Sequence, residues 1–241
     1  MNRVLQQWLL NLAIDFPVDF GLLPSLLDGN DREPQSLNVK ALRGFDLDGA
    51  VARLVELAEK GLIEFLHQPG PGEARAISPS EVLTHGRRSG VEKELSFQLT
   101  DAGGRAWESV AEPHWHRMQG GFATPREENG RQIGWDWTLF SQDREHLMAS
   151  LGWWPVLNHG EQIDLSSITW EFAEAYQVKY WKRLPNMHLV NFQSVLGSPS
   201  VPAWKHGNTP EWFTAWSIAR STWYRQPWEM ESWPPVSDSQ S

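Results

Sequence analysis

The amino-acid sequence predicts an α+β protein of two modules, because helical and strand-like apolar patterns occur in both halves of the chain. Apolar residues recur at a three- to four-residue spacing over 47–58, which is typical of one buried helix face. Over 95–99 and 176–180, apolar and polar residues alternate, which is typical of strands with one buried side. The segment 120–131 is polar and rich in helix and strand breakers, so it is predicted to link the modules.

The composition restricts the classes of function. The chain has 241 residues, of which 40% are hydrophobic and 21% charged, and this balance is ordinary for a globular protein with a real core. It has no cysteine, which excludes disulfides, thiol nucleophiles and zinc sites built on thiolates. Its net charge of −9 is unlike that of a typical free-standing nucleic-acid binder. The sequence contains no long apolar run and no signal-peptide pattern, so we expect a cytoplasmic protein with no membrane contact.

The N-terminal module is predicted to span residues 1–119. Its predicted helices cover 2–14, 36–43, 47–60 and 101–118, and its two paired strands cover 62–67 and 95–99. Asp46 and Thr100 are suitable N-caps for the third and fourth helices, and Gly61 is a suitable end for the third. Leu54 and Leu57, on the apolar stripe of the third helix, are predicted core residues. The stretch 69–93 is rich in proline, glycine and serine and is predicted to be a loop.

The order of elements over residues 46–118 is a helix, a strand, a long loop, a second strand and a closing helix. This order resembles the winged-helix family, and the resemblance covers residues 36–118. It implies that the exposed side of helix 47–60 would enter a DNA major groove. It also implies that the terminal helices, over 2–14 or 100–118, could form a homodimer.

The charges of this module favour two different partners. The exposed side of helix 47–60 is predicted to carry four acids and one arginine, namely Asp46, Asp48, Arg53, Glu56 and Glu59. Four carboxylates would repel the phosphates of a nucleic acid. The long loop, in contrast, contains basic residues that could grip phosphate or a narrow minor groove. The DNA-binding candidates are therefore His85, Arg87, Arg88 and Lys93, together with Arg53.

The second module is predicted to span residues 132–233 and to be followed by a disordered tail over 234–241. Its predicted elements are a helix from Ser141 to Leu151, strands over 168–182 and 187–195 with a turn at 184–186, and a helix that starts at Thr209. Most of the fifteen tryptophans of the chain lie here, and most are expected in the core. Aromatic residues beside cations or prolines are the exceptions, because such residues often anchor protein partners. The partner-binding candidates are Trp181, Arg225, Trp228 and Trp233.

No motif in the sequence predicts an enzyme, a cofactor or a metal site. Glu108, Glu112 and His116 have a spacing that suits a carboxylate–imidazole metal site on one helix face, but Pro113 interrupts that helix. Nucleophile-elbow and phosphate-loop motifs are absent from the sequence.

The sequence favours a non-enzymatic protein-binding role, as an adaptor, a regulator or a toxin-neutralising partner. The acidic charge, the acidic helix face and the surplus of aromatic residues support this interpretation. The alternative is a DNA-binding transcriptional regulator of winged-helix type, which the order of elements and the basic loop support.

Overall fold

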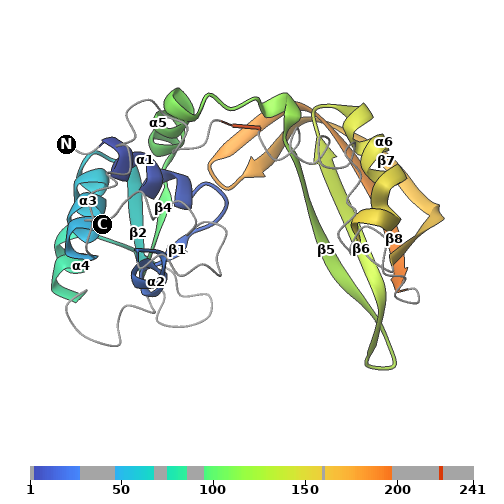
Figure 1. Cartoon of the computed structure of the whole chain (residues 1–241), viewed down its shortest axis with the longest axis horizontal. Coiled ribbons are helices and arrows are strands. Elements are labelled where there is room, and N and C mark those ends of the chain that lie inside the picture. The colour runs from blue at the N-terminus through green and yellow to red at the C-terminus, as the bar shows by residue number, and fades with distance from the viewer. Residues whose placement is uncertain are drawn as a thin grey trace, which may run out of the picture. The chain divides into compact units, whose positions relative to one another are not determined.

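A computed structural model describes residues 3–27, 47–67, 75–85, 95–158, 161–196 and 223–224 of the chain. The α+β class is confirmed, because helices are combined with two four-stranded antiparallel sheets (Figure 1). The described residues form two compact units. Unit 1 contains those up to Glu112 together with Lys179–Lys182, and unit 2 contains those of Pro113–Val178 and Arg183–Tyr224.

Unit 1 contains five helices and a small sheet among its described residues. The helices are α1 (Arg3–Leu12), α2 (Leu23–Leu27), α3 (Leu47–Glu59), α4 (Pro79–His85) and α5 (Asp101–Ala111), with a 3₁₀ turn at Phe20–Leu22. The strands are β1 (Val18–Asp19), β2 (Ile63–His67), β3 (Arg75–Ile77) and β4 (Leu95–Leu99), in the order β1-β4-β2-β3. The predicted pairing of β2 with β4 is confirmed, and Phe65 lies opposite Phe97 in the core.

The structure confirms the local signals for the end of helix α3 and for the start of α5. Gly61 has a φ of 67°, which a glycine adopts at little cost, and it ends α3 as predicted. The hydroxyl of Thr100 accepts a hydrogen bond from the amide of Gly103, so Thr100 is the N-cap of α5. The end of α5 differs from the prediction. The helix stops at Ala111 because Glu112 adopts a left-handed conformation and Pro113 follows.

The predicted loop over 69–93 contains strand β3 and helix α4, and the sequence held a signal for that helix. The amide of Ser78 donates to the Glu81 carboxylate at 2.8 Å, and the Glu81 amide donates to the Ser78 hydroxyl at 3.3 Å. This reciprocal pair is a capping box, and Pro79 occupies the first helical position, where proline is favoured.

The turn at Tyr180 and Trp181, between the two longest strands of the described residues, belongs to the core of unit 1. The phenol of Tyr180 donates to the carbonyl of Ala13 at 2.5 Å and accepts from the amide of Leu99 at 2.6 Å. The indole of Trp181 donates to the carbonyl of Ile14 at 3.0 Å and meets the ring of Trp107 edge-on. Lys179 and Lys182, on either side of this turn, form ion pairs with Asp15 and Glu108.

Two glycines of α5 leave room for this packing. A Cβ atom at Gly104 would overlap the ring of Trp181, and one at Gly103 would overlap the backbone carbonyl of Leu62. Gly152, which lies in helix α6 (Arg144–Leu157), has no atom within 4 Å of such a Cβ.

Gly103→Ala should lower the free energy of unfolding by about 1–3 kcal/mol, because a backbone atom cannot be displaced as a side-chain end can. Gly152→Ala is the matched control and should raise it by about 0.5–1 kcal/mol through helix propensity. Chemical denaturation of both variants checks the pair. Equal effects of the same sign would contradict the close approach of α5 to Leu62.

The partly buried phenol of Tyr180 should make stability depend on alkaline pH. Burial raises the pKa of Tyr180, and the nearby charges of Glu64 and Asp15 raise it further, although the hydrogen bond from Leu99 lowers it. The folded state therefore holds the phenolic proton more tightly than the unfolded state, whose tyrosine pKa is about 10. This contribution is fully present below about pH 10 and is lost as the pH rises from there towards the folded-state pKa.

Denaturation curves at about pH 9 and about pH 11 should show a fall in stability for the native chain. The fall should be smaller for Tyr180→Phe, which has no phenolic proton to lose. An equal fall in the free energy of unfolding between the two pH values in both proteins would show that Tyr180 does not remain protonated in the folded state.

Among its described residues, unit 2 contains helix α6 and a sheet of four longer strands. These are β5 (Gln119–Glu128), β6 (Arg131–Ser141), β7 (Glu161–Lys179) and β8 (Lys182–Leu196), in the order β5-β6-β8-β7. The predicted linker over 120–131 is wrong, because these residues form β5, a tight turn and the start of β6. Asn129 and Gly130 both have positive φ, as a two-residue hairpin turn requires, and Asn-Gly is its strongest sequence signal.

Two further boundaries in unit 2 differ from the predictions. The N-cap of α6 is Asp143, whose carboxylate accepts from the amides of Glu145 and His146, whereas Ser141 was predicted. The turn between β7 and β8 lies at Tyr180 and Trp181 and not at 184–186. Asn186 keeps a positive φ of 55°, so its turn-like signal marks a local irregularity inside β8. The helix predicted from Thr209 and the one over 36–43 lie outside the described residues.

Candidate functional site

The two faces of the sheet in unit 2 differ in what covers them. Helix α6 lies along one face (Figure 1), where Leu147 and Trp154 pack against Leu139, Val190 and Phe192. The antiparallel register places paired residues on the same face. Residues of β6 and β8 that alternate with this core therefore point to the opposite face, which we call the open face.

One end of the open face is apolar and covered. Phe140 and Leu189 lie opposite each other on β6 and β8 and are both buried. They belong to a cluster with Met118, Val178, Leu184 and Met187, against which Trp115, Ala173, Tyr176 and Trp223 pack. The remaining part of the open face is polar, and that part is the candidate site.

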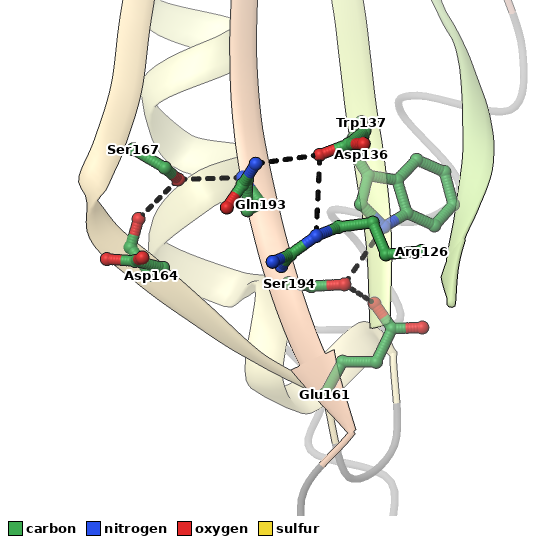
Figure 2. Close-up of polar contacts among 8 residues, drawn as sticks. All are labelled: Arg126, Asp136, Trp137, Glu161, Asp164, Ser167, Gln193 and Ser194. Atoms are coloured by element: carbon green, nitrogen blue, oxygen red, sulfur yellow. Dashed lines mark hydrogen bonds and ion pairs between the residues drawn. The ribbon is translucent and has the colours of Figure 1, made fainter. Parts of the chain in front are cut away.

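Side-chain hydrogen bonds join the strands across the polar part of the open face. In one row the Thr138 hydroxyl donates to the Asn191 amide oxygen at 2.7 Å, and the Asn191 amide nitrogen donates to the Glu171 carboxylate at 2.7 Å. In the next row Gln193 donates to the Asp136 carboxylate at 3.0 Å, and the guanidinium of Arg126 lies 3.8 Å from the same oxygen (Figure 2). These contacts fix the orientation of both amide side chains.

The same face contains a groove of about 580 Å³. Its lining residues come from β6, β7 and β8 and are Asp136, Trp137, Thr138, Asp164, Ser166, Ser167, Thr169, Asn191, Phe192 and Gln193. Most of them are hydroxyl, amide or carboxylate residues, and none of the described residues that line the groove is a lysine or an arginine.

The groove lies beside an irregular part of β7. The backbone amide of Gln193 in β8 donates to the hydroxyl of Ser167 at 2.7 Å. That hydroxyl donates in turn to the backbone carbonyl of Asp164 at 2.6 Å (Figure 2). A side chain thus takes the place of a backbone acceptor. The Asp164 carboxylate accepts from the hydroxyl and the amide of Ser166. These hydrogen bonds, with the charge of Arg126, lower the pKa of Asp164 below its ordinary value.

A second polar chain supports the start of β7 on the side of α6. The buried hydroxyl of Ser194 donates to the Glu161 carboxylate at 2.8 Å and accepts from the indole of Trp137 at 3.3 Å (Figure 2). The indole of Trp154 donates to the same carboxylate at 3.4 Å. Each donor here has a partner, as buried polar groups require. We assign this chain a structural role, because it fixes β7 against β6, β8 and α6.

Neither the partner-binding candidate Trp181 nor the three residues whose spacing would suit a metal, Glu108, Glu112 and His116, line this groove. Trp181 was predicted to be an exposed contact residue, but only 8% of its surface is exposed and it lies in the core of unit 1. Glu108 forms an ion pair with Lys182, and α5 ends before Glu112 and His116, so the predicted helical spacing of these three residues is broken. No group of three or more metal-ligating side chains occurs among the described residues. Trp228, Trp233 and Arg225 lie outside the described residues.

The DNA-binding candidates are only partly placed. Arg53 lies on α3 with 14% of its side chain exposed and forms an ion pair with Glu56. His85 is the last residue of α4. Arg87, Arg88 and Lys93 lie outside the described residues. The dimer predicted through residues 2–14 or 100–118 stays a prediction, although Leu9 and Leu10 of α1 are fully buried within unit 1.

Sequence reasoning missed every residue of the open face. The alternation in β6, where Asp136 and Thr138 flank Trp137, was a readable sign of one polar and one apolar side. The partners of these residues on β8 and β7 depend on a register across the sheet, which no local pattern gives.

In the part of the chain that the structure describes, no helix is long and apolar enough to cross a membrane. Comparisons of the chain with protein-family models, with curated proteins and with solved structures found no match.

Proposed function

We propose that this chain is a non-enzymatic protein-binding protein, of adaptor, regulator or toxin-neutralising type, and that it binds its partner through the open face of the sheet in unit 2. The observation that supports this most directly is the ordered row of Thr138, Asn191 and Glu171 on a face that α6 leaves uncovered. Polar contacts at a solvated surface add little to stability. Side chains that are already ordered, however, lose less entropy when a partner binds.

The charge of the open face supports a protein partner over a nucleic acid. Three carboxylates lie on it or line its groove, those of Asp136, Asp164 and Glu171, and Arg126 is the cation that contacts Asp136. A surface with this excess of negative charge repels phosphate and attracts a basic protein surface.

We further propose that unit 1 is a winged-helix-like module that serves as a scaffold. The helix α3, followed by the antiparallel pair β2 and β4, supports this assignment. On α3, Asp48, Glu56 and Glu59 are exposed, whereas Arg53 is largely covered and paired. This helix would therefore present mainly negative charge to a DNA groove.

Site-specific photo-crosslinking in the native host tests the proposed binding surface. A photoreactive residue at Thr169, which is exposed in the groove, should capture one defined protein, and capture should survive nuclease treatment of the lysate. The matched control has the same residue at Glu145, which is exposed on α6. Equal capture from both positions, or capture from neither, would count against the open face as the binding surface.

The alternative function is a DNA-binding transcriptional regulator, which the order of α3, β2 and β4 favours. Because α3 exposes acids, we expect duplex DNA to bind weakly or not at all at physiological salt. Fluorescence anisotropy with random and genomic duplexes measures this. Sub-micromolar, sequence-selective binding would replace the first function with the second, and Arg87→Ala combined with Arg88→Ala should then reduce its salt dependence.

A further inference from the structure

The strand that borders the groove is also an edge of its sheet. In the described part of the chain, β8 is the neighbouring strand of β7 on one side, and no strand lies on the other. The edge strand β7 has 19 residues, which is long for a strand of a globular protein. A long edge presents backbone N–H and C=O groups that can pair with another extended chain.

The two edges of this sheet differ in how they are protected. Natural edge strands are usually protected by proline, by lysine or by a bulge. Strand β5 contains Pro125 and has a register shift between Arg126 and Glu127. From Glu161 to Val178, in contrast, β7 contains no proline, lysine or arginine, and the irregular part described above is confined to 164–167. Leu165 and Phe172 of β7 are 78% and 57% exposed, so apolar side chains are also available along this edge.

We propose that β7 accepts an extended, basic peptide segment of the partner as an added strand, with a lysine or arginine side chain on the β7 side of the groove, beside Asp164. This inference rests on the proposed protein-binding function and names the chemistry of the partner. Backbone pairing with β7 supplies part of the affinity, and the charge of the added side chains supplies specificity.

Charge complementarity selects this occupant over a second copy of the chain. The acids of β7 are Glu161, Asp164, Glu171 and Glu174, and its one cation, Lys179, lies at the end and pairs with Asp15 in unit 1. Two copies of β7 side by side would bring carboxylates close to carboxylates, which destabilises cross-strand pairs. A basic strand would place opposite charges there instead.

Defined peptides test the proposal directly. The first probe is a fluorescein-labelled peptide of eight residues that alternates lysine with threonine, and the second replaces every lysine with glutamate. At physiological salt the lysine peptide should bind the intact chain at least tenfold more tightly than the glutamate peptide. Asp164→Asn combined with Glu171→Gln should weaken binding of the lysine peptide about tenfold, equivalent to about 1.4 kcal/mol. Glu145→Gln on α6 is the matched control and should leave binding unchanged.

Backbone methylation separates strand addition from simple charge attraction. Because alternate residues of a strand direct their N–H groups to opposite edges, N-methylation of one alternate set should abolish binding, and methylation of the other set should not. Hydrogen exchange of the intact chain should also slow over 165–174 when the lysine peptide binds, which checks the site without any substitution. Equal binding of both methylated peptides, or unchanged exchange over 165–174, would overturn the proposal.

The outcomes also separate this inference from the proposed function. If crosslinking at Thr169 captures a partner but the lysine peptide fails these tests, strand addition to β7 is wrong and the protein-binding function stands. If neither experiment detects binding, both proposals fall.

Discussion

Trp181→Ala should lower the free energy of unfolding of unit 1 by about 3–5 kcal/mol, the range for truncation of a large buried aromatic side chain. The indole of Trp181 packs on Gly104, meets Trp107 edge-on and donates to the carbonyl of Ile14. The substitution removes this volume and leaves a buried carbonyl without its donor, so both a cavity and a lost hydrogen bond contribute.

Hydrogen exchange measured over β4 and α5 reports the stability of unit 1 separately from that of unit 2. Protection from exchange should fall there in Trp181→Ala. The fall should be smaller in Trp181→Phe, because phenylalanine keeps most of the apolar volume of the side chain. Phe172→Ala is the matched control for an exposed aromatic residue and should stay within about 0.5 kcal/mol of the native chain. A change below 1 kcal/mol in Trp181→Ala would show that the turn at 179–182 is not part of the core of unit 1.

Leu54→Ala is expected to cost about 2–5 kcal/mol, because this side chain is fully buried at the centre of the apolar stripe of α3. Helix α3 packs against α1, α2, α4 and β2, so a cavity at Leu54 would be surrounded by elements that cannot all close around it. The sequence predicted both Leu54 and Leu57 as core residues, and both are fully buried.

The matched control for this substitution is Leu47→Ala, at the exposed first residue of the same helix. It should change stability by less than about 0.5 kcal/mol. Reversible denaturation of both variants measures the difference. Equal effects at Leu47 and Leu54 would mean that the buried side of α3 has been assigned incorrectly.

Elements whose signals lie within a few neighbouring residues could be predicted from the sequence. The stripe through Leu54, the turn at Gly61 and the N-cap at Thr100 each depend on a residue pattern within or at the end of one helix. The capping box of Ser78 and Glu81 and the Asn129-Gly130 turn are equally local, so the helix and the hairpin missed there were also encoded. The glycine and proline residues nearby predict a loop and a linker instead, because the same residues are common outside regular structure.

The sequence by itself determined the α+β class, the main helix of unit 1 and its two paired strands, because apolar spacing reports which side of one element is buried. Only the tertiary structure decided that Trp181 is a core residue of unit 1, since its burial depends on Gly104 and Ile14, far away along the chain. It also decided the candidate site. Asp136 and Gln193 become neighbours through the register of β6 and β8, and α6 covers the other face of the sheet. Local sequence patterns predict neither arrangement, because both depend on residues far apart along the chain.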